Sequence, residues 1–190
     1  MNRFVVLLLV VIFSHSVFGQ EDHGDMQIPI NFSYFGETLV HPGFEVGYEN
    51  NFYKWFNYTA SIGYYVHQRH HAGLFLNAGI NWRYTFSFGY SVELGIGLGY
   101  LHTWQHGGKT YTVDDGGNVD RKIVIGHPSF MPVVKIGLLG WDLRKKTDIP
   151  IRINIDAIAF GQLPYNRYIM PHFALKAGAT YYFNIPARNN

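Results

Sequence analysis

The chain has 190 residues, no cysteine and a formal net charge of +2 at neutral pH. Without cysteine we expect neither a disulfide-stabilised scaffold nor a lipid-modified cysteine anchor, and the near-neutral charge offers no basic stripe for nucleic acid. Aromatic residues make up 17% of the chain but charged residues only 15%, whereas a soluble domain carries about 25% charged residues. This composition does not supply the charged surface that a soluble domain presents to water.

The first 19 residues predict a cleaved secretory signal. Arg3 provides the positive start, residues 4–13 form an unbroken apolar run, and Val17-Phe18-Gly19 ends on the small residue that a signal peptidase needs. The apolar run, about ten residues, is too short to cross a bilayer core of about 30 Å as a helix. We therefore expect export, with cleavage before Gln20, and a single domain over residues 20–190.

Residues 88–104 show the clearest pattern, a strict alternation of large apolar side chains with Gly, Ser and Glu. Period-two alternation predicts a β-strand with one apolar face. Seven further segments alternate in the same way, and no charged residue falls on these faces. In chain order the apolar faces are Ile28/Ile30/Phe32/Tyr34, Phe44/Val46/Tyr48, Tyr58/Ala60/Ile62/Tyr64/Val66, Leu74/Leu76/Ala78/Ile80/Trp82, Phe88/Tyr90/Val92/Leu94/Ile96/Leu98/Tyr100, Val134/Ile136/Leu138, Ile149/Ile151/Ile153/Ile155 and Phe173/Leu175/Ala177/Ala179/Tyr181/Phe183.

The polar faces of these strands distinguish a membrane barrel from a soluble one. A soluble sandwich or lipocalin needs charge on its water-facing side, but here that face is mostly Gly, Ser, Asn and Thr. Aromatic residues at strand ends suit the two interfaces of a bilayer; they are Tyr34, Tyr48, Tyr58, Trp82, Tyr84, Tyr90, Tyr100 and Phe183. We predict an all-β fold, an eight-stranded antiparallel up-and-down transmembrane β-barrel, with a soluble all-β domain as the alternative.

The connections between the strands predict the orientation. Short turns fall at residues 50–55, 85–87 and 142–148, and the outward loops at residues 36–42, 68–72, 102–128 and 161–171. In bacterial barrels the short turns are periplasmic and the long loops extracellular. Within the longest loop, residues 109–113 and 120–125 are expected to pair around the turn-rich run 114–118.

Four acidic and four basic residues lie on the polar, inward faces. They are Glu45, Glu49, Arg83, Glu93, Lys135, Arg152, Asp156 and Lys176. Side chains fill the interior of an eight-stranded barrel, so buried charges there have to pair. We expect Asp156 to lie opposite both Lys135 and Lys176, in one shared network within a closed lumen. A proton or ion pathway through these residues is the alternative.

The last predicted strand contains Gly178-Ala-Thr-Tyr181-Tyr-Phe183. A glycine followed by alternating hydrophobic residues that end in an aromatic is similar to the insertion signal recognised by the barrel-assembly machinery. Together with the eight strands, it makes the chain resemble small outer-membrane barrels of the OmpA/OmpX type and the Bacteroidota outer-membrane β-barrel group. Residues 184–190 depart from that pattern by following the signal, and they are too short for the peptidoglycan-binding domain of OmpA. The resemblance implies a location in the outer membrane of a Gram-negative bacterium, with membrane lipid and the assembly machinery as partners.

Eight histidines beyond the signal and the N-terminal tail fall at outward strand ends or in outward loops. They are His41, His67, His70, His71, His102, His106, His127 and His172. Imidazole is the commonest metal ligand, so this rim is a candidate site for zinc, copper or haem. Its candidate ligands are His67, His70, His102, His106, His127 and His172.

No carboxylate stands at a spacing that would support these histidines. The alternation also sends His67 and His172 toward the lumen but His102 toward lipid. We therefore expect that the candidate ligands do not converge and that the protein carries no cofactor.

Two further motifs suggest chemistry. His127-Pro-Ser129 is similar to the His-x-Ser of lipid A deacylases, but Phe130 stands where that family has asparagine, and the motif lies far from the C-terminal strands. The run from Asp114 to Asp120 spaces oxygen ligands as calcium loops do, without the glutamate that completes them. We expect a turn before a strand in the first case and a solvated hairpin tip in the second.

The sequence thus favours a structural or surface-interaction barrel without catalysis. Capture of metal or haem at the extracellular histidine rim is one alternative, and a lipid A-modifying enzyme is the other; any further extracellular ligand is unknown.

Overall fold

The computed structural model describes residues 26–39, 41–68, 70–105, 109–114, 116–123, 126–165 and 168–185. The predicted signal at residues 1–19, its cleavage point, His106 and residues 186–190 lie outside these ranges. Residues 28–183 form one compact unit. Outside it, Gln27 Nε2 donates to Asn184 Oδ1 at 3.0 Å.

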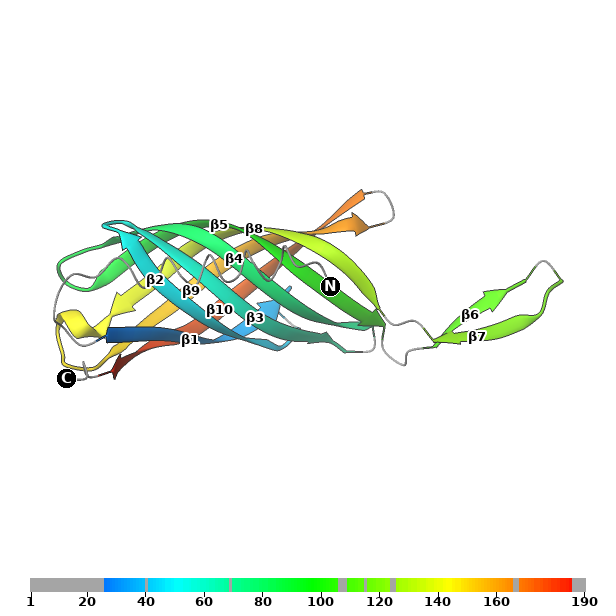
Figure 1. Ribbon diagram of the computed structural model, residues 1–190, viewed down its shortest axis with the longest axis horizontal. Helices are drawn as coiled ribbons and strands as arrows, with labels where there is room; N and C mark the ends of the chain where they lie inside the picture. Colours follow the sequence, from blue (N-terminus) through cyan, green and yellow to red (C-terminus); the bar gives the residue numbers. More distant parts are fainter. Residues whose placement is uncertain are drawn as a thin grey trace, which may run out of the picture. The chain divides into compact units, whose positions relative to one another are not determined.

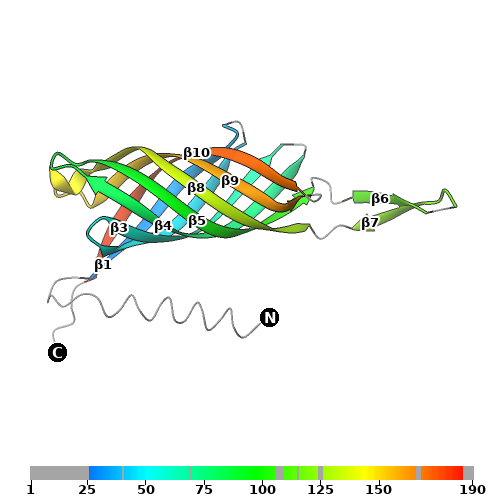
Figure 2. The ribbon, with the colours of Figure 1, turned by 90° about the horizontal axis from the view of Figure 1, so that it is seen from above.

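Within the described ranges, eight long strands form one closed barrel. They are β1 (Met26–Glu37), β2 (Gly43–Tyr53), β3 (Phe56–His67), β4 (His71–Thr85), β5 (Tyr90–Gln105), β8 (His127–Asp142), β9 (Ile151–Tyr165) and β10 (Tyr168–Ile185). Strands that follow one another around the barrel pair antiparallel, and β1 and β10 lie side by side to close it (Figure 1). Figure 2 shows the same strands tilted around the barrel from a second side. The predicted up-and-down barrel is confirmed.

The connections define two ends of the barrel. At the turn end lie the start of β1, the end of β10 and the connections β2–β3, β4–β5 and β8–β9, the last containing a single 3₁₀ turn, η1 (Leu143–Lys145). At the loop end lie the connections β1–β2, β3–β4, β5–β8 and β9–β10. The expected loop at residues 161–171 is wrong, because β9 and β10 continue through most of it and Tyr165 pairs with Tyr168. No helix among the described residues is long and apolar enough to cross a membrane.

The β5–β8 connection contains the predicted hairpin. Strands β6 (Lys109–Val113) and β7 (Val119–Ile123) form a separate two-stranded sheet. Asp114 closes its turn: Oδ1 accepts the backbone N–H groups of Gly116 and Asn118, and Oδ2 accepts the Asn118 side-chain amide. The hydrogen bonds from Asn118 hold the pKa of Asp114 below its usual value. These contacts are those of a hairpin turn, as the sequence predicted.

The outer face of the barrel strands is apolar. Midway along the strands the exposed side chains are aliphatic, and Ile96 is 71% exposed. Others on this face are Ile62, Leu76, Ile80, Leu94, Leu98, Val134 and Ile136. By contrast, every described charged side chain of the eight barrel strands is buried or half-buried. A continuous apolar belt of this kind is stable against lipid and not against water.

Aromatic side chains border the belt at both ends. At the turn end, Phe88 packs between Phe86, Tyr90 and Trp141, with ring centroids 5.5, 6.2 and 6.3 Å away. At the loop end the exposed aromatics include Tyr34, Phe44, Tyr100, Phe130 and Phe173. Rings at these two levels match the aromatic girdles of barrels that span a bilayer.

Two local features differ from simple alternation. The segment expected to begin at Phe88 becomes strand only at Tyr90, because Gly89 takes a turn conformation with φ of +99°. In β8, the register shifts between Gly137 and Leu139, so that Leu138 and Leu139 both face outward and Asp142 faces inward. An extra residue in one strand reverses the faces that follow it.

Replacing Ile96 with Arg should prevent stable insertion, because a cation on the lipid face near the midplane costs about 2–4 kcal/mol. The measurement is the fraction of folded protein in lipid vesicles, seen as a gel band that shifts on boiling. Ser87→Arg, in the exposed turn between β4 and β5, is the matched control and should insert normally. Equal insertion of both variants would contradict a lipid-facing Ile96.

Candidate functional sites in the lumen and at the loop end

A network of five ionised side chains occupies the lumen toward the turn end. Glu49 accepts from Arg83 Nη2 at 2.8 Å and from Arg152 Nη2 at 2.7 Å. Glu93 accepts from Arg83 Nε at 2.7 Å and Lys135 Nζ at 2.5 Å, and lies 3.5 Å from Arg152 Nη1. These residues come from β2, β4, β5, β8 and β9, so the network ties together strands from around the whole barrel. Each buried charge thereby has an opposite charge in contact, as a confined interior requires.

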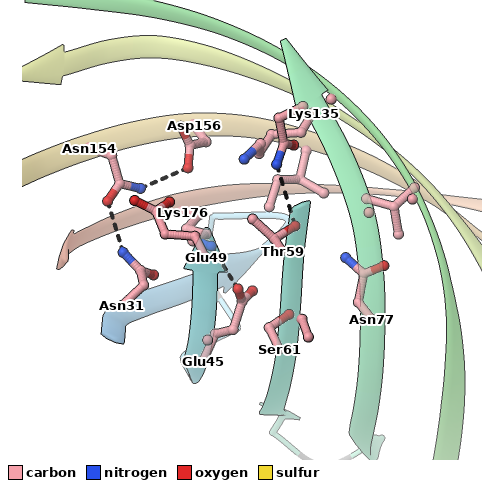
Figure 3. A pocket seen from close by; sticks show the side chains of 18 of the residues that line it. Asn31, Glu45, Glu49, Thr59, Ser61, Asn77, Lys135, Asn154, Asp156 and Lys176 are labelled. Atoms are coloured by element: carbon pink, nitrogen blue, oxygen red, sulfur yellow. Dashed lines mark hydrogen bonds and ion pairs between the residues drawn. The ribbon is translucent and has the colours of Figure 1, made fainter. Parts of the chain in front are cut away.

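A second polar group lies next to this network. Lys176 Nζ on β10 donates to Glu45 Oε1 on β2 at 2.6 Å. Asn31 donates to Asn154 Oδ1 at 3.1 Å, and Asn154 donates to Asp156 Oδ2 at 2.7 Å. Figure 3 shows these side chains pointing into one space. Seven of the eight predicted lumen charges therefore form ion pairs.

The exception is Asp156, whose predicted register is confirmed on β10 and wrong on β8. Asp156 does pair in register with Lys176, but Gly137 and not Lys135 lies opposite it on β8. The positive charges of both lysines interact electrostatically with Asp156. Their hydrogen bonds go to other carboxylates, however: Lys135 donates to Glu93 and Lys176 to Glu45. The β8–β9 pairing is offset from the expected register, and three-dimensional packing gives the two ammonium groups closer partners.

The space between these groups is small. The cavity of Figure 3 has a volume of about 50 Å³ and is lined by Asn31, Asn77, Lys135, Asp156 and Lys176 among others. The buried Asn77 Oδ1 has no hydrogen-bond partner in the protein. A polar cavity of this size holds a few water molecules.

An aromatic layer closes the lumen toward the loop end. Phe35 packs against Phe75, Tyr65 and Phe160 with ring centroids 4.8, 6.1 and 6.1 Å apart, and Leu101 and Met131 complete this buried layer. Across the β3–β4 pair, a Cβ at Gly63 would lie 2.2 Å from the Phe75 ring. Sequence reasoning missed this layer, although Phe35, Phe75 and Phe160 stand out of phase with the apolar faces.

Above the aromatic layer, five histidines gather around one carboxylate. Glu37, at the end of β1, is 3% exposed; its Oε1 accepts from His172 Nδ1 at 2.9 Å and its Oε2 contacts His41 Nδ1. The His41 ring stacks on His67 at 3.5 Å, and His67 lies 4.5 Å from His70 and 5.1 Å from His71, centroid to centroid. We call Glu37, His41, His67, His70, His71 and His172 the histidine cluster.

One sequence-based expectation about the rim was wrong. A carboxylate does support the histidines, since Glu37 contacts both His41 and His172. Of the candidate ligands, only His67 belongs to the group of three ligand atoms formed with Glu37 and His41, so the expectation that the six candidates do not converge stays a prediction. The signal that could have revealed Glu37 is its position four residues before His41, at the end of an inward face.

The other described rim histidines lie elsewhere. His102 faces outward as predicted, with Nδ1 2.9 Å from the Tyr100 hydroxyl. His127 Nδ1 lies 3.1 Å from Ser129 Oγ, and Gln162 Nε2 donates to that hydroxyl at 3.0 Å. No carboxylate among the described residues contacts His127. A serine and a histidine are thus in contact without the third group that orients the base in hydrolases.

The predicted assembly signal lies on β10 beside the closing seam. A Cβ at Gly178 would lie 2.4 Å from the Phe32 carbonyl oxygen and 2.2 Å from Ser33 Oγ on β1. Glycine is therefore needed at position 178 for β1 to approach β10. This packing requirement explains the glycine without any role in an assembly signal. Tyr181 and Phe183 point outward, with ring centroids 4.5 Å apart. Recognition by the assembly machinery stays a prediction.

Comparison with known proteins identifies the class of fold. No protein-family model matches the sequence, and no curated protein matches it. The structure is similar to the N-terminal β-barrel domain of Pseudomonas aeruginosa OprF, with 12% identity and a TM-score of 0.53 over 84% of this chain and 99% of that one. It is similar to Neisserial surface protein A, with 11% identity and a TM-score of 0.55 over 85% and 98%. A de novo designed transmembrane β-barrel matches with 9% identity and a TM-score of 0.50 over 87% and 100%.

At these identities the similarity shows the fold alone, which is that of a small eight-stranded outer-membrane barrel. This agrees with the resemblance to the OmpA/OmpX type. None of these neighbours supports a grouping with Bacteroidota.

Glu49→Ala should destabilise the barrel by about 3–5 kcal/mol, because it leaves two buried guanidinium groups without their shared carboxylate. Unfolding by urea in lipid vesicles, followed by tryptophan fluorescence, measures the loss. Asp156→Ala removes a carboxylate that has no ion pair and should cost clearly less. The reverse order of the two variants would show that the network is organised around Asp156.

Proposed function

We propose that this protein is a closed barrel of the bacterial outer membrane with a structural or surface-interaction role and no catalytic activity. The observation that carries the proposal is the filled lumen: the ion network and the aromatic layer together occupy it between the turn end and the loop end. A small barrel that conducts needs a continuous polar space, whereas here the cavity is about 50 Å³.

The proposed orientation follows the connections. The turn end faces the periplasm, and the loop end, with the β6–β7 hairpin, belongs to the cell surface. Export by the signal at residues 1–19 and insertion by the barrel-assembly machinery complete this proposal. A closed barrel with one long surface hairpin is suited to adhesion or to maintaining the integrity of the envelope.

The absence of catalysis is proposed from the His127–Ser129 pair. Ser129 is buried in the wall of the lumen, and its hydroxyl is bonded by Gln162. A serine nucleophile needs a base that is itself oriented by a third group, and His127 has no carboxylate partner among the described residues. The contact is better explained as part of the polar lining at the loop end.

Purified protein reconstituted into planar bilayers should show no large steady conductance, because side chains fill the lumen. A known open porin in the same bilayers is the positive control. Stable, ohmic openings that persist after removal of trace porins would overturn the closed-barrel proposal.

Cells that express the wild-type protein and cells that express Ser129→Ala should contain the same lipid A species, measured by mass spectrometry. The comparison isolates the one serine–histidine pair at the loop end. Lipid A that loses an acyl chain with the wild-type protein and keeps it with Ser129→Ala would make the protein an enzyme.

A further inference from the structure

The histidine cluster brings metal-ligand atoms from separate segments to one place. Glu37 ends β1, His41 lies in the β1–β2 connection, and His67 ends β3. One ligand atom from each of these three residues lies within 4.8 Å of the others. His70 lies in the adjoining connection and His71 begins β4, and both rings lie close to that of His67. The cluster thus holds more imidazoles than the carboxylate needs for hydrogen bonding.

Among the described residues, two buried polar atoms near this group lack a protein partner. One is the hydroxyl of Tyr65, whose ring lies edge-on to His71 at 6.0 Å. The second atom is His172 Nε2, the ring nitrogen that does not bond Glu37. Buried polar groups in native proteins almost always have a protein or water partner, so both atoms are available to water molecules beside the cluster.

We propose that Glu37, His41 and His67 bind a divalent transition-metal ion, with Zn²⁺ as the best fit. Two imidazoles and one carboxylate form the three-ligand set of open zinc sites, in which the fourth position is left for water or another ligand. The site has one carboxylate and no thiolate, so it suits neither Ca²⁺, which takes 6–8 oxygen ligands, nor Cu(I). The metal site goes beyond the proposed structural role, because a closed barrel needs no metal.

The geometry requires only side-chain movement. The three ligand atoms lie within 4.8 Å of one another, and zinc–ligand bonds are about 2.0–2.1 Å, so small side-chain movements bring all three atoms to one ion. His41 and His67 are at a connection and a strand end, and both are partly exposed, so their rings can rotate toward Glu37. His70 and His71 stand within reach of the fourth position.

His172 is a positioning residue in this site. It donates from Nδ1 to Glu37 Oε1 at 2.9 Å, and its ring stacks parallel on Phe160 at 4.8 Å. The stacking fixes the ring, and the hydrogen bond fixes one carboxylate oxygen while the other faces His41. Residues that hold a ligand in this way typically change metal affinity by about 10–100-fold when they are replaced.

The test is a calorimetric titration of the full, tag-free protein in detergent with Zn²⁺, repeated with Cu²⁺, Ni²⁺ and Ca²⁺. We expect one Zn²⁺ per chain and no binding of Ca²⁺. His41→Ala and His67→Ala should each weaken Zn²⁺ binding by at least about tenfold, and Glu37→Gln should do the same. His102→Ala and His127→Ala, which remove rim histidines outside the cluster, are the matched controls and should leave the affinity unchanged.

His172 has its own pair of variants. His172→Phe keeps the stacking on Phe160 and removes the donor, so Zn²⁺ binding should weaken by about 10–100-fold. His172→Asn keeps a donor near the position of Nδ1 and should restore most of the affinity. Each variant is first shown to be folded by its gel shift on boiling, so that lost binding is not lost structure.

The absorption spectrum of the Co²⁺-substituted protein provides a second readout, since a tetrahedral site with nitrogen and oxygen ligands gives strong visible bands. Binding that survives in both His41→Ala and His67→Ala, or that falls equally in the control variants, would overturn the proposal. So would the failure of Zn²⁺, Cu²⁺ and Ni²⁺ to bind the folded wild-type protein. Neither result would contradict the closed-barrel proposal, because that proposal is tested separately by the conductance measurement.

Discussion

In lipid, each backbone N–H and C=O group has to find its partner within the protein, because no water is present to replace it. Strands satisfy this condition only when the sheet closes on itself, so the contact between β1 and β10 decides whether the whole molecule is stable in a membrane. Gly178 on β10 allows the two strands to approach, because any side chain at this position would collide with the Phe32 carbonyl and Ser33 on β1. Closure then fixes which face of every strand meets lipid.

The same closure forces charge inward. None of the described charged side chains of the barrel strands lies exposed on the outer face, so ten of them share a narrow interior or its ends. The interior tolerates them because they are paired: Glu49 and Glu93 hold Arg83, Arg152 and Lys135 in a network that reaches across the barrel. Among the described residues, the network and the aromatic layer fill much of the lumen around a small polar cavity, and the proposed role at the surfaces of the barrel rests on this filling.

The loop end is where these constraints relax. Here the strands leave the apolar belt, the β5–β8 connection is the longest of the barrel, and polar side chains can meet one another without a cost in lipid. The histidine cluster forms at this boundary, with Glu37 still buried above the aromatic layer and His41 and His67 partly exposed. A buried carboxylate that orients exposed imidazoles is an arrangement suited to binding a small cation from outside.

The sequence alone determined the strands and their faces, since period-two alternation is a local property that the outward positions of Leu94 and Ile96 report directly. It also determined the hairpin turn in the β5–β8 connection, because the Asp114–Asn118 run carries local turn chemistry, but it did not predict the turn conformation of Gly89. It did not determine the pairing of Lys135 with Glu93, the isolation of Asp156 or the gathering of His41 and His67 around Glu37. Those contacts join strands far apart in the chain, and they depend on the strand register, on the bulge in β8 and on the curvature of the closed barrel. Alternation predicts which face of the strand a side chain lies on, but the residues that it contacts there depend on the closed sheet.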